Sequence, residues 1–162
     1  MSAPGAGEPR PTHLDERGRA RMVGVGHKPV VHRRAVAQAI VRMAPASARA
    51  MSEGTLPKGD AGAVARVAGI MAAKRTPELI ALCHPLPLDR VEVEVTTDAG
   101  AGEVTIRATA ETSARTGVEM EALTAAAVAA LNVYDLVKGI DPDLTIDGVR
   151  LLEKTKGEAP AP

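Results

Sequence analysis

Polar side chains interrupt four segments that are otherwise apolar or tightly turning, and these are the residues whose types could carry chemistry. The segments are Lys58-Gly59-Asp60, Cys83-His84-Pro85, Glu119-Met120-Glu121, and Asp135 with Lys138. Lysine, histidine and carboxylate groups in one pocket are suited to moving protons and neutralising negative charge. The question for the fold is whether it brings them together.

Each of these residues also has an ordinary structural explanation. Asp135 and Lys138 are spaced as an i,i+3 ion pair on a helix. His84 could be a hydrogen-bonded structural histidine, and Cys83 a small buried hydrophobic residue. Glu119 and the nearby Glu121 could complement the dipole at the start of a helix. Taken singly, the residues leave both explanations open.

The sequence predicts no metal site and no standard nucleotide-binding loop. Its four histidines and its single cysteine reproduce neither a C-x-x-C nor an H-E-x-x-H arrangement. Gly24-Val25-Gly26 lacks the third glycine of a dinucleotide fingerprint, and Lys58-Gly59-Asp60 reverses the Gly-Lys order of a phosphate loop.

Composition argues against nucleic acid and membrane partners. The 20 Lys plus Arg residues balance the 20 Asp plus Glu residues, and one Tyr with no Phe or Trp leaves little for bases to stack on. No apolar run approaches the roughly 20 residues of a bilayer span, and the N-terminus lacks the apolar core of a secretory signal. The single cysteine fits a reducing compartment. We therefore expect a cytoplasmic protein.

A single folded domain is predicted for residues 13–156 of the 162-residue chain. Residues 1–12 and 157–162 are rich in Pro, Gly and Ala and are expected to form flexible tails. Within the domain, apolar periodicity predicts the following elements. They are a strand over 33–43, a helix over 58–74, a short helix capped by Thr76, a hairpin of strands 91–97 and 103–112, a core helix over 119–138, and a β-rich segment over 144–152.

This order of elements predicts an α+β sandwich, in which helices pack on one face of a mostly antiparallel sheet. The alanines of residues 33–43 make a helix the rival interpretation there, and the alternation of residue types favours a strand.

Read together, the segments resemble the cyclic pyranopterin monophosphate synthase family from Thr12 to Lys154. The most specific strings are KGDAGAVARVAGIMAAKRTPELIALCHPLPL, residues 58–88, and RTGVEMEALTAAAVAALNVYDLVK, residues 115–138. The chain is identified as a member of this family from those strings.

The resemblance implies a ferredoxin-like subunit, assembled as a hexamer of three dimers with active sites at the dimer interface. The implied reaction is that of a lyase in molybdenum cofactor biosynthesis. It converts 3′,8-cyclo-7,8-dihydro-GTP to cyclic pyranopterin monophosphate and pyrophosphate, with no redox change and no required organic cofactor.

The resemblance also assigns roles by position. The acid–base and positioning residues of the family fall on Lys58, His84, Asp135 and Lys138. The substrate-contact segments match Leu82, Cys83, His84, Met120 and Glu121, with Glu119 in the same acidic string. Lys154 matches a lysine of the C-terminal segment, and Lys28 and Arg33 match basic residues suited to holding phosphate.

Helix geometry adds an independent argument about assembly. Glu121 and Asp135 are fourteen positions apart, or about 21 Å along one continuous helix at 1.5 Å per residue. One pocket cannot easily take both from one chain, so we expect a site shared between two subunits of an obligate oligomer.

The chain departs from the family pattern at several positions. Gly24 stands where the family has Asp, Val31 where Thr is usual, and Ala81 where Pro normally precedes Leu-Cys-His. At the end of the chain Glu158 replaces an expected lysine, for which Lys156 could substitute. These changes raise the alternative of a non-catalytic paralogue kept for ligand binding or assembly, but retention of the four central residues favours an active enzyme. An RNA-binding role for the sheet would need aromatics and a basic face that this sequence lacks.

Overall fold

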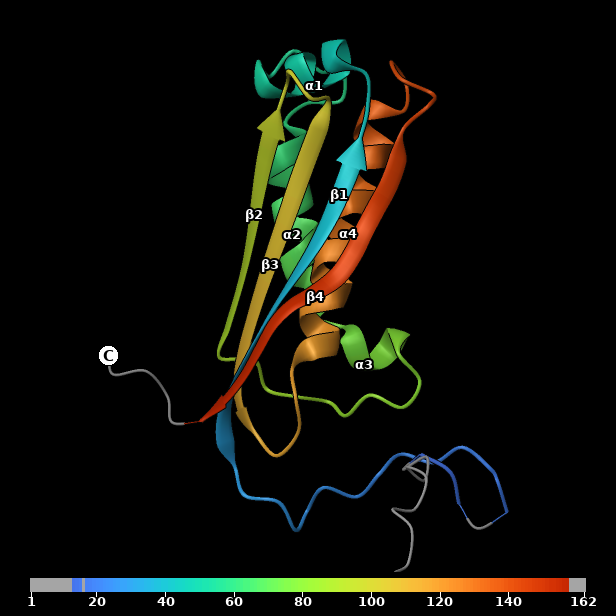
Figure 1. The fold of residues 1–162 in the computed structure, drawn as a ribbon, viewed down its shortest axis with the longest axis vertical. Helices are drawn as coiled ribbons and strands as arrows, with labels where there is room; N and C mark the ends of the chain where they lie inside the picture. The colour runs from blue at the N-terminus through green and yellow to red at the C-terminus, as the bar shows by residue number, and fades with distance from the viewer. Residues whose placement is uncertain (1–12, 16, 158–162) are drawn as a thin grey trace, which may run out of the picture.

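The fold was described from a computed structural model, which covers residues 13–15 and 17–157 (Figure 1). The elements in chain order are β1 Val31–Arg42, α1 Pro45–Ser52, α2 Ala61–Lys74, α3 Thr76–Leu79, β2 Arg90–Asp98, β3 Glu103–Ala114, α4 Glu119–Val137 and β4 Thr145–Gly157. Of the predicted tails, residues 1–12 and 158–162 lie outside the described residues, whereas Gly157 is not part of a tail but the last residue of β4, paired with His32.

The four strands form one antiparallel sheet in the order β2-β3-β1-β4. Helices α2 and α4 lie side by side against one face of the sheet (Figure 1). The element order and the strand order are those of a ferredoxin-like sandwich, which confirms the predicted α+β class with helices packed on one face.

Small side chains explain how the layers approach so closely. On β1, Ala35, Ala37 and Ala39 are fully buried at alternate positions and belong to the core. Helix α4 is similarly rich in buried alanines. Where α2 crosses α4, a Cβ added at Gly69 would lie 2.9 Å from the carbonyl oxygen of Ala125. Alanine has a high helix propensity, but the alanines of β1 lie in a strand because their small side chains let the helices pack closely on the sheet. Packing therefore overrides the local preference.

Several predicted boundaries differ from the structure. Helix α2 begins at Ala61 because Asp60 caps it by accepting a hydrogen bond from Ala63 N at 2.9 Å, so Lys58 lies in the preceding turn. Thr76 is the first residue of α3 rather than its cap. Helix α1 was not predicted. Strand β4 continues to Gly157, beyond the predicted 144–152, because its pairing with β1 extends to His32.

Helix α4 runs the length of the subunit and separates its two ends (Figure 1). It starts beside α3 and ends near α1. Its 19 residues and mean hydropathy of 1.3 would suit a membrane span, but half of that stretch is buried among α2 and the sheet. A core helix of a globular domain has the same properties, so the helix gives no argument for a membrane.

Candidate active site

The larger of two adjoining hollows, about 420 Å³, lies at the end of the molecule where α4 begins. Three segments meet there: the N-terminal arm (residues 13–15 and 17–30), the turn after α3, and the start of α4. Its lining comprises His13, Val23, Val25, Lys28, Ile80, Leu82, Cys83, His84, Thr116, Gly117, Glu119 and Met120. The turn follows the last residue of α3, Leu79, and is closed by a hydrogen bond from Cys83 N to the carbonyl oxygen of Ile80.

His84 connects the N-terminal arm to the rest of the hollow. Its Nε2 lies 2.7 Å from the carbonyl oxygen of Val23. A carbonyl can only accept, so Nε2 must carry the hydrogen of this bond. In the neutral ring, Nδ1 then keeps its lone pair and can accept a proton. The histidine is thereby oriented as a base on the wall of the hollow.

Behind this wall lies a buried carboxyl group. Glu121 is 1% exposed, and its Oε1 accepts a hydrogen bond from the Cys83 thiol at 3.7 Å. Its Oε2 has no hydrogen-bond partner among the described residues. Burial raises the pKa of Glu121, which favours the protonated acid. Burial, followed by the nearby Glu121 charge, raises the pKa of the Cys83 thiol to about 11. Cys83 is therefore a neutral thiol near pH 7 and not a nucleophile.

A second hollow of about 270 Å³, which we term the cationic hollow, adjoins the first and shares Gly117 and Glu119 with it. Its other lining residues are Arg33, Arg34, Val118, Lys154, Thr155 and Lys156. Val118, which precedes α4 without providing a side-chain cap, and Glu119, its first residue, both line this hollow, so the helix start lies at its wall. A helix start among four cationic side chains attracts anions such as phosphate.

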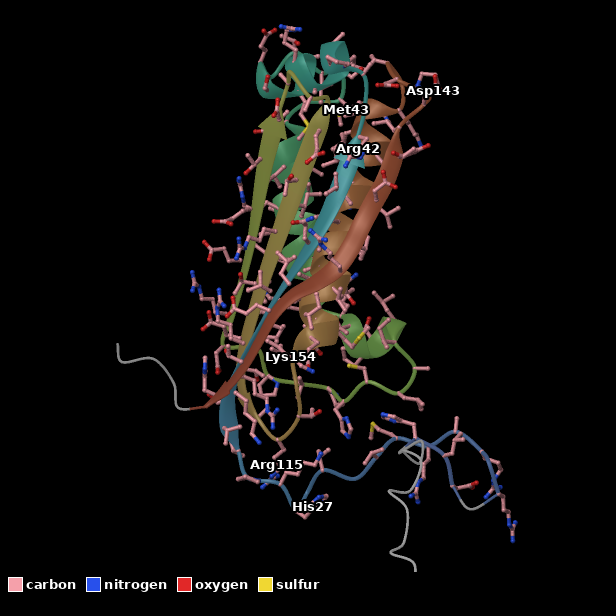
Figure 2. All side chains as sticks on the ribbon, in the orientation of Figure 1. His27, Arg42, Met43, Arg115, Asp143 and Lys154 are labelled. Atoms are coloured by element: carbon pink, nitrogen blue, oxygen red, sulfur yellow. The ribbon has the colours of Figure 1, made fainter. Side chains whose placement is uncertain are left out.

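Two of these cations are held by neighbouring groups. Arg33 donates from Nε to the Ala114 carbonyl at 3.1 Å and from Nη2 to the Arg115 carbonyl at 3.2 Å. Arg34 pairs with Glu153 at 2.8 Å and with Glu111 at 3.7 Å. Figure 2 shows Lys154 on β4, at the same end of the subunit as Arg115 and His27.

A third candidate region, a cluster of charged side chains, lies at the opposite end of α4. Lys58 Nζ donates to the Asp135 carbonyl at 2.8 Å and lies 3.4 Å from its Oδ2, while Lys138 Nζ lies 2.7 Å from Oδ1. The hydrogen bond and the charge of Lys138, followed by the charge of Lys58, lower the pKa of Asp135. The carboxylate in turn raises the pKa of Lys138. Because Lys58 joins from 77 positions away, the cluster is more than a local helix pair.

The model of the MoaC family matches residues 22–157. This chain belongs to the MoaC family. It is similar to proteins named cyclic pyranopterin monophosphate synthase from three bacteria in particular. That of Thermomicrobium roseum is 59% identical over 91% of this chain and 89% of the relative. Those of Roseiflexus sp. and Nostoc sp. are each 53% identical over 91% of this chain and over 94% and 88% of the relatives.

For this MoaC-family chain, the structure gathers most of the predicted site residues at one end. Lys28, Leu82, Cys83, His84, Glu119 and Met120 line the larger hollow, with Glu121 buried behind it. Arg33 and Lys154 line the cationic hollow. Lys58, Asp135 and Lys138 stand apart at the other end of α4. Within one chain, therefore, His84 and Lys58 do not share a pocket.

Sequence reasoning missed the contribution of the arm and of Arg34. The contact of Val23 with His84 joins residues 61 positions apart, and no local pattern predicts it. Arg34 had a signal, because it directly follows Arg33 at the start of a predicted strand. Among the described residues, no group of three or more His, Cys, Asp or Glu side chains could hold a metal ion.

Gly24 is one of the positions at which the chain departs from the family pattern. A Cβ added there would meet no atom within 4 Å, so the arm has room for a side chain at this position.

Proposed function

We propose that this chain is a cyclic pyranopterin monophosphate synthase of molybdenum cofactor biosynthesis. It would act as a lyase on 3′,8-cyclo-7,8-dihydro-GTP, giving cyclic pyranopterin monophosphate and pyrophosphate. The observation that carries the proposal is the pair of adjoining hollows. One has a histidine on its wall and a buried carboxyl group behind that wall, and the other is cationic. Membership of the MoaC family and the names of the similar proteins support the same reaction.

The larger hollow fits the ring part of such a substrate. The unpartnered Oε2 of Glu121 is a buried polar atom beside Cys83, and a polar ring edge would supply the hydrogen bond that it lacks. His84 can accept a proton at Nδ1 while Val23 holds Nε2. We assign proton transfer to His84 and ring recognition to Glu121, with Leu82, Cys83 and Met120 as further walls.

The cationic hollow fits the phosphates. Arg33 and Lys154 would neutralise phosphate charge here, with Lys28 on the wall of the adjoining hollow. Charge neutralisation favours departure of pyrophosphate because negative charge develops on the leaving group. Ring rearrangement and closure of the cyclic phosphate change no oxidation state, so the proposed reaction needs no redox cofactor.

We further propose that the third cluster, Lys58 with Asp135 and Lys138, completes the site of a neighbouring subunit. Helix α4 is continuous, which keeps Glu121 and Asp135 about 21 Å apart within one chain. The cluster carries two lysines against one carboxylate and is about half-exposed, so it has surplus positive charge to offer a partner's ligand. A hexamer built as a trimer of dimers, with sites at the dimer interface, would join the two ends. We place this assembly in the cytoplasm.

A turnover assay tests the proposed function. The full chain is incubated with the cyclised dihydro-GTP, and both pyrophosphate and the pyranopterin product are quantified. We expect one pyrophosphate per product formed, and His84→Ala should lose turnover while Glu53→Gln, an exposed change just after α1, should retain it. Binding of the substrate without turnover by the unmodified chain would contradict the proposal and favour a non-catalytic paralogue.

A further inference from the structure

Glu119 occupies the boundary between the two hollows and belongs to the lining of both. Its Oε1 lies 3.6 Å from Lys154 Nζ, which reaches it from β4. The lysine side chain is 68% exposed and the glutamate side chain 31% exposed. The pair therefore forms at the mouth of the cationic hollow, where an incoming anion would also meet Lys154.

The position of this carboxylate depends on a glycine. The Glu119 side chain folds back over Gly117, and a Cβ added at Gly117 would overlap its carboxylate. Gly117 thus leaves the space in which Glu119 can point toward Lys154.

Among the described residues, Glu119 is also the one acidic residue in the lining of the cationic hollow, whose other charged residues are arginines and lysines. Arg33 is held by two carbonyls, and Arg34 is paired with Glu111 and Glu153. Because both arginines already have partners, Lys154 supplies an important part of the positive charge with which a ligand can pair. Glu119 and a phosphate group would compete for it, because both are anions that bind an ammonium group.

We propose that Glu119 competes with phosphate for Lys154 and thereby weakens retention of pyrophosphate in the cationic hollow. The inference rests on the proposed function, in which pyrophosphate is a product that must leave. A substrate that carries both ring and phosphates overcomes this competition through its contacts in the larger hollow. Free pyrophosphate has no such contacts, so Glu119 favours its release. Glu119 is then a specificity-determining residue for the phosphate part of the site.

A double-mutant cycle tests the competition directly. The affinity for inorganic pyrophosphate is measured by titration calorimetry for the unmodified chain, Glu119→Gln, Lys154→Met and the double variant. At low ionic strength, Glu119→Gln should bind pyrophosphate about two- to fivefold more tightly, the range expected from a partly exposed ion pair. This gain should disappear in the Lys154→Met background and shrink at high salt.

Two further variants separate this competition from a general change of charge. Gly117→Ala keeps every charge but displaces the carboxylate, so it should also tighten binding of pyrophosphate. Glu53→Gln removes an exposed charge just after α1 and should leave the affinity unchanged.

An unchanged affinity in Glu119→Gln, or an equal gain with and without Lys154, would overturn the inference. The titration needs no turnover, so its result is independent of the assay of the proposed function. A chain that turns over substrate but shows no coupling in the cycle rejects this inference alone. A chain that shows the coupling without turnover rejects the proposed function alone.

Discussion

Replacement of Glu121 by leucine should stabilise the folded chain and abolish turnover. The side chain is 1% exposed, its Oε1 has only the Cys83 thiol at 3.7 Å, and its Oε2 has no hydrogen-bond partner among the described residues. A buried polar group without its hydrogen bond costs about 1–3 kcal/mol. Leucine removes that cost at similar size. We therefore expect the free energy of unfolding to rise by about 1–2 kcal/mol and Tm by about 2–8 °C.

The size of this gain should depend on pH. Burial raises the pKa of Glu121 above its ordinary value of 4.5, so the folded chain keeps a proton that the unfolded chain loses. This contribution to the stability of the unmodified chain is fully present below pH 4.5 and is lost as pH rises through the raised pKa. Glu121→Leu has no such titration. Its advantage should therefore be smallest at pH 4.5 and below, and should grow at higher pH.

Denaturant unfolding between pH 4 and pH 8, together with turnover of the cyclised dihydro-GTP, measures both effects. Glu121→Gln is the matched control, because it keeps a polar side chain of similar shape but cannot titrate. It should lose the pH dependence without the full gain in stability. A leucine variant that is less stable than the unmodified chain at pH 7, or that keeps its turnover, would refute the reasoning.

Three other substitutions and one modification extend these tests. Gly69→Ala should destabilise the fold by about 1–3 kcal/mol, because the new Cβ meets the Ala125 carbonyl at 2.9 Å; an unchanged Tm would argue against such tight packing of α2 on α4. Asp135→Asn should leave Tm close to that of the unmodified chain while lowering turnover by roughly 10²- to 10⁴-fold; near-normal turnover would make this cluster structural. Gly24→Asp should fold normally, since its Cβ enters open space, and should change the kinetics; identical kinetics would show that the position is not functional. Cys83 should react slowly with iodoacetamide at pH 8 when folded, because its pKa is about 11, and rapidly after unfolding; equal rates would contradict a neutral thiol in the folded chain.

The sequence predicts the layers of the fold well because the apolar periodicities are strong. Alternation along β1 places the buried Ala35, Ala37 and Ala39 on one face of the strand and Arg34 and Gln38 on the other, and α4 carries a long apolar stripe. Helix α1 has only eight residues, no side-chain cap and a low apolar content, so its local signal is weak. The full length of β4 depends on its pairing with β1, which local sequence does not contain.

The candidate site is predictable in its residues and less so in its arrangement. Family strings identify His84 and Asp135, and the helical rise already places Asp135 far from Glu121. The contact of Lys58 with Asp135 arises from the packing of α2 on α4, and that of His84 with Val23 from the path of the arm. Both join segments more than 60 positions apart, so their geometry follows from tertiary structure.

The most direct test of this account is activity in mixed oligomers, because it requires both the proposed reaction and a site built from two subunits. Lys58→Ala and Glu121→Ala, each inactive alone, are unfolded together, refolded and assayed with the cyclised dihydro-GTP. In a random mixture about one quarter of the interface sites receive both unmodified halves. The account predicts recovery of turnover to roughly that fraction. No recovery in oligomers shown to contain both chains would contradict it.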